Sequence, residues 1–160
     1  MKKFIVLSIV LLMLAGFAIT SSAMDVPLLA GKDINVGTLT VTVDVVNNNL
    51  LVTYTITDLG WELLETHLYV GTSAPTKSAP GQFPYGPKDV VANVVEYVIP
   101  FADFGELPVC IAAQAEVRKQ TGVDPDTGEL IYQEETAWAE GVLIRPGKNW
   151  AMYFTFPLPE

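Results

Sequence analysis

The chain has 160 residues, with 9 Lys and Arg against 18 Asp and Glu, and a formal net charge of −9 at pH 7. Nucleic acids and anionic membrane surfaces are bound through clustered Lys and Arg, so this balance argues against both as partners. The single cysteine, Cys110, excludes an intramolecular disulfide. Its neighbours Val109 and Ile111 indicate a small buried hydrophobe within a strand rather than a nucleophile.

The N-terminal residues have the layout of a secretory signal peptide. Lys2 and Lys3 precede an apolar run over residues 4–19, and small residues follow up to Ala23. This pattern predicts a signal peptide over residues 1–23 and a secreted chain, extracellular or at the cell surface, that meets the membrane only during export. An uncleaved anchor is the alternative, although the run is shorter than the roughly 20 residues of a spanning helix. The remaining residues 24–160 carry 7 basic and 18 acidic side chains, a net charge of −11.

After a lead-in over residues 25–32, two alternating segments predict a β-hairpin. Apolar and polar side chains alternate over residues 38–45 and again over 50–57. Between them Asn47, Asn48 and Asn49 form a turn, since Asn tolerates positive φ. One face of the hairpin is then core, and the other is rich in threonine. Threonine favours β-strands, so a threonine face is expected from strand propensity alone. An ice-binding or glycan-contacting surface is the alternative.

The next strand, residues 61–70, leads into the segment that we expect the rest of the chain to support. Strand alternation predicts Leu64, Thr66, Leu68 and Val70 on the core face, and Leu63, Glu65, His67 and Tyr69 on the other face. The loop over residues 72–89 follows. Loops of this length are functional or disordered in most proteins. Phe83 and Tyr85, among prolines and glycines, favour an ordered loop held by aromatic packing.

The remaining segments are also strands and turns. We predict strands over residues 90–100, 107–118, 130–132, 135–144 and 150–157, with a single helical turn near 101–106 and a turn at 122–129. The alanines of 107–118 indicate a place where an aromatic ring or another sheet packs closely. Seven or eight short strands without a helix pattern predict an all-β chain. We expect one antiparallel β-sandwich domain over 24–160, immunoglobulin-like or jelly-roll-like, after the signal peptide.

Two groups of residues suggest a metal. The acidic turn places Asp124, Asp126 and Glu129 close together, and such turns can supply oxygen ligands to calcium, the one cofactor that the sequence suggests. Asp-Pro and Thr-Gly are also ordinary hairpin-tip residues. Glu65 and His67 lie on one strand face, as a metal site or an acid–base pair requires, but zinc needs further ligands. A structural histidine, paired with Glu65 or Glu135, is the alternative.

Aromatic side chains suggest a different kind of site. Rings exposed beside carboxylates bind sugars by stacking on their faces. The aromatic candidates are Trp61, Tyr69, Phe83, Tyr85, Trp138 and Trp150. We expect Trp61 and Trp150 to pack in the core or to hold the long loop in place.

Several blocks carry a family resemblance: ETHLYV at 65–70, PGQFPY at 80–85, IAA at 111–113, ETAWA at 135–139 and NWAMYF at 149–154. In this order they resemble an uncharacterised family of secreted β-rich proteins and surface domains of bacteria and fungi. The resemblance implies an extracellular domain, often part of a larger surface protein, without an established activity. Gln114 stands where the family often has a histidine, and the acidic turn is shorter than in the family.

Together these observations predict a secreted, non-catalytic surface or matrix module that binds a glycan or a surface protein through the 72–89 loop. The predicted ligand-binding residues are Glu65, His67, Tyr69, Phe83, Tyr85, Gln114, Glu135 and Trp138. One alternative is a metal-dependent hydrolase or lyase that uses Glu65 and His67. The other is a structural subunit that assembles through strand edges, with the apolar final strand as its candidate edge.

Overall fold

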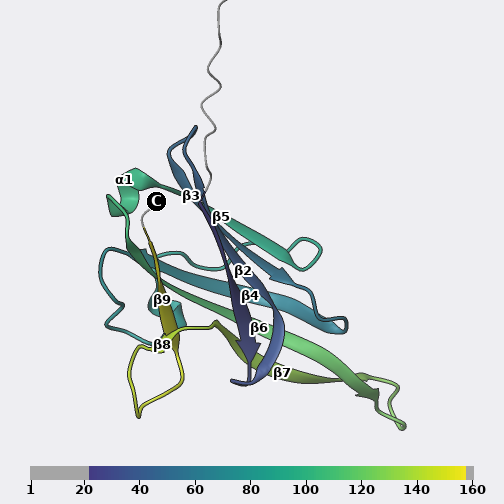
Figure 1. Ribbon diagram of the computed structural model, residues 1–160. Coiled ribbons are helices and arrows are strands. Elements are labelled where there is room, and N and C mark those ends of the chain that lie inside the picture. The colour runs from purple at the N-terminus through teal and green to yellow at the C-terminus, as the bar shows by residue number, and fades with distance from the viewer. Residues whose placement is uncertain (1–21, 158–160) are drawn as a thin grey trace, which may run out of the picture.

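The computed structural model describes residues 22–157, which form an all-β structure with one large antiparallel sheet of nine strands that does not close (Figure 1). The predicted signal peptide lies outside the described residues except for its last two. The elements in chain order are β1 (Ala23–Ala30), β2 (Ile34–Asp44), β3 (Asn49–Ile56), β4 (Trp61–Gly71), the 3-10 turn η1 (Pro80–Gln82), β5 (Val94–Pro100), α1 (Phe101–Phe104), β6 (Val109–Val123), β7 (Leu130–Ala139), β8 (Val142–Leu143) and β9 (Met152–Phe156). Within residues 22–157, no helix has the length and apolarity to span a membrane.

The sheet has two halves that β1 joins. Its order is β5-β3-β2-β1-β7-β6-β9-β8, and β4 pairs with the other edge of β6. β1 pairs along its whole length with β2, but only residues 28–30 of β1 pair with residues 137–139 of β7. A short seam of backbone hydrogen bonds therefore connects the β5-β3-β2-β1 half to the half that β6 organises.

The predicted hairpin is confirmed as β2 and β3. The two strands pair in register from Gly37 and Ile56 to Asp44 and Asn49, and Asn48 has a positive φ of 58° in the turn. Asp44 holds this turn by accepting hydrogen bonds from the backbone and side-chain nitrogens of Asn47.

The two halves enclose one core. The apolar face of each half is buried in the same cluster, which contains Leu39, Val52, Leu68 and Ile111. Two tyrosines connect the halves by hydrogen bonds. The Tyr54 hydroxyl of β3 donates to the His67 carbonyl of β4 at 2.9 Å, and the Tyr97 hydroxyl of β5 lies 2.8 Å from the Thr66 hydroxyl. The buried Thr66 on the core face of β4 is thereby satisfied.

A β-bulge changes part of the predicted pattern in β4. Leu63 pairs with Val117 and the next pair joins Glu65 to Glu116, so Leu64 has no partner. Because the bulge reverses the alternation, Leu63 is buried and Leu64 is exposed, opposite to the prediction. The alternation beyond the bulge is as predicted, with Thr66, Leu68 and Val70 in the core.

The strand edges differ from the predicted ones. The apolar final strand β9, the predicted free edge, pairs with β6 over residues 154–156 and with β8 over residues 152–153, so only part of each of its edges is unpaired. Lys88 lies at the outer edge of β5, where its ammonium donates to the Glu96 carbonyl at 2.9 Å. A charged side chain on an edge strand opposes pairing with another chain.

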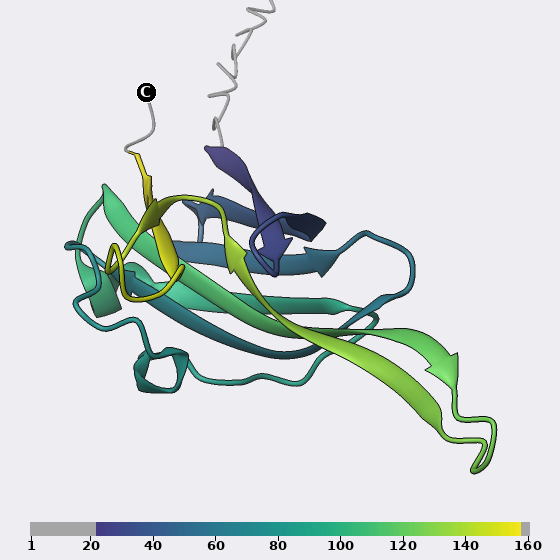
Figure 2. The same cartoon turned by 90° about the horizontal axis from the view of Figure 1, so that it is seen from below.

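One part of the sheet projects beyond the rest. The last pair between β4 and β6 joins Trp61 to Lys119, whereas β6 and β7 continue to pair as far as Val123 and Leu130. Residues 120–134 thus form a hairpin that extends from the body of the molecule (Figures 1 and 2). We refer to residues 120–134 as the arm.

Candidate functional site

The outer face of β4, β6 and β7 carries a row of polar side chains that crosses all three strands. Strand register places His67 beside Gln114, and Glu116 beside both Glu65 and Thr136. His67 Nδ1 lies 3.0 Å from Gln114 Oε1, and Gln114 Nε2 donates to Glu116 Oε1. The Thr136 hydroxyl donates to the Glu116 carboxylate at 3.3 Å. We call these five residues the polar row.

The hydrogen bonds define the orientation of each group in the row. Because Gln114 donates its amide nitrogen to Glu116, its amide oxygen faces His67, and Nδ1 of the ring must carry the proton. The other ring nitrogen, Nε2, lies 3.2 Å from Glu65 Oε1. Both ring nitrogens therefore face oxygen atoms of neighbouring side chains. Gln114 is fully buried, and both ends of its amide are satisfied within the row.

An aromatic cluster packs beside the polar row and holds the 72–89 loop. The Phe83 ring lies 6.1 Å from the Trp138 ring in an edge-on arrangement, and 6.1 Å from the Tyr69 ring. Phe83, Trp138, Ala112 and Ala151 form a second buried cluster outside the main core. Ala112 of β6 confirms the expectation that an aromatic ring packs closely on its alanines. Trp150 packs against this cluster rather than in the main core, where Trp61 lies as predicted.

The burial of these rings limits what they can bind. Phe83 is 9% exposed and Trp138 is 3% exposed, so neither presents a face for sugar stacking. Tyr69 is partly exposed, and its hydroxyl donates to the Ser73 carbonyl at 2.9 Å. The prediction of an ordered loop held by aromatics is confirmed for Phe83, which serves as its anchor.

Two predicted site residues lie on the opposite side of the sheet. Tyr85 exchanges backbone hydrogen bonds with Leu68 at the free edge of β4, and its ring packs against the main core. Burial raises the pKa of the Tyr85 phenol, and the neighbouring Asp103 carboxylate raises it further. Glu135 pairs with Val117, so the two side chains lie on the same, core-facing side of the sheet. There the Gln133 amide nitrogen donates to the Glu135 carboxylate at 2.9 Å. The predicted grouping of Glu135 with His67 is wrong, because the register places Thr136 on that face instead.

Glu116 and Thr136 are the members of the row that the sequence analysis missed. The alternation over 107–118 already places Glu116 on the outward face with Gln114, but its pairing with Glu65 and Thr136 depends on the register of distant strands. Burial raises the pKa of the Glu116 carboxyl above its ordinary value of 4.5, and the hydrogen bonds from Thr136 and Gln114 partly oppose this rise.

The raised pKa predicts the direction of a pH effect. Since folded Glu116 holds its proton more tightly than unfolded Glu116, its contribution to stability is complete below about pH 4.5 and is lost as the pH rises through the folded pKa. We expect Glu116→Gln, which keeps an acceptor for Thr136, to gain stability relative to the wild type between about pH 4 and pH 7. Urea unfolding across this range measures the difference, with exposed Glu129→Gln as the control. If the wild type became more stable relative to Glu116→Gln as the pH rises, the raised pKa of Glu116 would be contradicted.

The acidic turn at the tip of the arm is held by its own hydrogen bonds. Asp124 Oδ1 accepts from the backbone nitrogens of Asp126 at 2.8 Å and Thr127 at 2.9 Å. These bonds lower the pKa of the Asp124 carboxyl. Across the described residues 22–157, no group of three or more His, Cys, Asp and Glu side chains is arranged to hold a metal ion. Neither the acidic turn with Asp124, Asp126 and Glu129 nor the pair Glu65 and His67 therefore gathers the ligands that a metal site requires.

A small hollow lies under the 72–89 loop on the polar-row side of the sheet. It encloses about 100 Å³ and is lined by Tyr69, Pro75, Thr76, Lys77, Gln82, Phe83 and Pro84. The loop is fixed at a further point, where the Asn149 amide donates to the Ser78 hydroxyl at 2.7 Å.

Comparison with protein-family models, with curated proteins and with solved structures gave no match for this chain. The resemblance to secreted surface proteins therefore stays a prediction, and the function must be argued from the site itself.

Proposed function

We propose that this protein is a secreted, non-catalytic binding module of the β-sandwich type, immunoglobulin-like or jelly-roll-like, that binds a glycan at the 72–89 loop. The observation that carries the proposal is the hollow beneath this loop. A loop of this length is held in place by the Phe83 anchor, the pairing of Tyr85 with Leu68 and the bond from Asn149 to Ser78. Such a loop has lost its flexibility before any ligand arrives, which lowers the cost of binding.

The lining of the hollow suits one sugar residue. Its lining includes the polar residues Thr76, Lys77 and Gln82 and the aromatic residues Tyr69 and Phe83. Pockets for drug-sized ligands are several times larger than about 100 Å³, so the hollow fits a single ring at the end of a chain. The Lys77 ammonium favours a sugar that carries a carboxylate.

The polar row supports binding over catalysis. His67 has a side chain only 13% exposed, and both of its ring nitrogens are engaged, by Gln114 and by Glu65. A general base needs a free position within hydrogen-bond reach of its substrate. In this arrangement the row stabilises the sheet under the loop, and the metal-dependent hydrolase or lyase is the weaker alternative.

The proposal is tested by NMR titration of the secreted chain with neutral and acidic oligosaccharides. We expect shifts at Tyr69 and along residues 75–84, and a loss of affinity of about tenfold, or about 1.4 kcal/mol, for Lys77→Ala and for Gln82→Ala. Lys88→Ala is the matched control, because Lys88 belongs to the same loop but does not line the hollow. Shifts that fall elsewhere, or equal affinity in all three variants, would refute the glycan site.

A further inference from the structure

The arm has features of an interaction surface that the proposed function does not use. Within residues 120–134, β6 and β7 pair only with each other, because β4 begins at Trp61 opposite Lys119 and β7 pairs with β1 only at residues 137–139. Val123, Leu130 and Ile131 are each about half exposed on this hairpin. An isolated two-stranded hairpin is marginally stable in water, and exposed apolar side chains increase its need for a partner.

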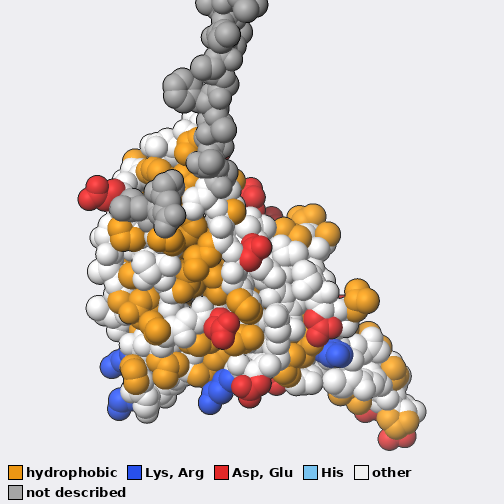
Figure 3. Space-filling model, in the orientation of Figure 1, with side chains coloured by type: hydrophobic (Ala, Val, Ile, Leu, Met, Phe, Trp, Pro, Cys, Tyr) orange, Lys and Arg blue, Asp and Glu red, His pale blue; other side chains and the backbone are white. Residues whose placement is uncertain are grey.

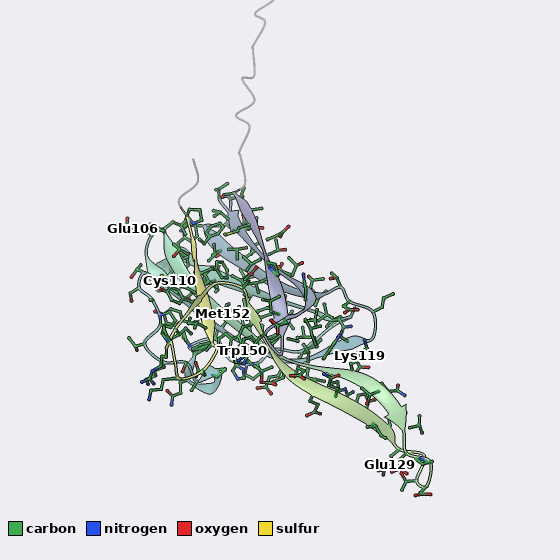
Figure 4. The ribbon with its side chains drawn as sticks, turned by 60° about the horizontal axis from the view of Figure 1, so that its bottom comes forward. Glu106, Cys110, Lys119, Glu129, Trp150 and Met152 are labelled. Carbon is green, nitrogen blue, oxygen red and sulfur yellow. The ribbon has the colours of Figure 1, made fainter. Side chains whose placement is uncertain are left out.

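The tip of the arm is acidic and has a fixed shape. The backbone nitrogen of Asp124 donates to the Glu129 carbonyl and that of Gly128 donates to the Asp124 carbonyl, both at 2.8 Å. Asp126 and Glu129 project from this turn, and neither takes part in an ion pair among the described residues. Figure 3 shows the apolar side chains along the arm with acidic ones at its end, and Figure 4 places Glu129 there.

A pocket of the opposite character lies at the β1–β2 turn and the loop before β9. It encloses about 350 Å³ and is lined by Lys32, Leu143, Gly147, Lys148, Asn149 and Trp150. Val142 and Leu143 of β8 are exposed beside it, and Arg145 belongs to the same loop. Basic residues are scarce in this chain, so the presence of two lysines in one pocket with an aromatic ring and apolar neighbours is unusual.

We propose that the arm of one copy of this protein docks into the Lys32–Lys148–Trp150 pocket of a second copy. The acidic tip would face the two lysines, while Val123, Leu130 and Ile131 would cover Val142 and Leu143. The arm points away from the body of its own chain, so another molecule must supply the pocket (Figures 1 and 2).

Charge identifies the occupant as a second copy. Residues 24–160 have a net charge of −11, so two copies repel each other over most of their surfaces, and the pocket is a place where an acidic tip is attracted. The contact joins the arm of one copy to the pocket of another, so copies assemble head to tail. A closed dimer forms only if each of two copies places its arm in the pocket of the other.

Sedimentation of the full secreted chain at rising concentration tests the proposal. We expect its average mass to rise with concentration at low ionic strength and to fall when salt screens the charges. The double variant Asp126→Lys with Glu129→Lys reverses the charge of the tip and leaves Asp124 to hold the turn. The double variant Lys32→Glu with Lys148→Glu reverses the charge of the pocket. Each double variant alone should associate at least about tenfold more weakly than the wild type.

Mixing the two double variants is the decisive experiment. In the mixture, each reversed surface meets its complement on the other variant, so we expect association to return. Asp89→Lys with Glu106→Lys is the charge-matched control for the tip variant, since Glu106 lies at the far end of the molecule from Glu129 (Figure 4), and it should not weaken association. Circular dichroism shows whether each variant is folded. A wild type that stays monomeric at low salt, or a mixture that fails to associate, overturns the proposal.

Discussion

Replacing Gly37 with alanine is expected to lower the free energy of unfolding by about 3 kcal/mol, near the upper end for an overpacked interior. Gly37 lies in β2 between its partners Leu28 of β1 and Ile56 of β3. A Cβ atom at this position would lie 2.1 Å from the Thr55 carbonyl oxygen and 2.9 Å from the Ile56 Cα. Both are backbone atoms of a paired strand, so the clash cannot be relieved by rotating a side chain.

Urea unfolding of Gly37→Ala measures this effect, and Gly86→Ala is the matched control. A Cβ at Gly86 would meet no atom within 4 Å, so we expect the stability of the control to change by less than about 1 kcal/mol. If the two variants proved equally stable, the close approach of β2 and β3 at Gly37 would be refuted.

Trp138→Ala is expected to destabilise the protein by about 4 kcal/mol, a large fraction of the stability of an ordinary domain. The Trp138 side chain is 3% exposed and its ring contacts Phe83, the anchor of the 72–89 loop. Removing the ring leaves a cavity and also removes the surface on which the loop packs. We therefore expect the loop to become sensitive to proteases under conditions where the rest of the chain stays folded.

Limited proteolysis with mass spectrometry distinguishes this local effect from general instability. Trp61→Ala is the control, because Trp61 is equally buried but lies in the main core, on the other face of the sheet. It should destabilise the protein to a similar extent without selective cleavage within residues 72–89. Trp138→Phe should restore most of the protection. Equal cleavage of the loop in both alanine variants would contradict its attachment to Trp138.

Local patterns in the sequence were sufficient for most strands. The alternation of Leu39, Val41 and Val43 with threonines predicts β2, and the same alternation predicts the core face of β6 with Val109, Ile111 and Val117. The helical turn expected near 101–106 is α1. These features depend on neighbouring residues alone, so the side-chain period is enough to find them.

Features that depend on distant residues could not be predicted. The lead-in predicted over residues 25–32 is mostly strand β1, which contains Pro27, a residue that is uncommon inside strands. The Leu64 bulge reverses part of β4 without a local signal such as glycine. The candidate site was predicted in part: His67 and Gln114 do meet, whereas the faces of Glu135 and Tyr85 follow from pairings between distant strands.

The seam between β1 and β7 has a consequence for how the chain folds. β1, β2 and β3 are neighbours in sequence and can pair soon after synthesis, but the partner of β1 across the seam is near the other end of the chain. Contacts between such distant segments form slowly, because the intervening chain must first be ordered. Until β7 arrives, the inner edge of β1 stays unpaired and is open to aggregation. Refolding should therefore depend on protein concentration, with the N-terminal hairpin gaining amide protection before the seam closes.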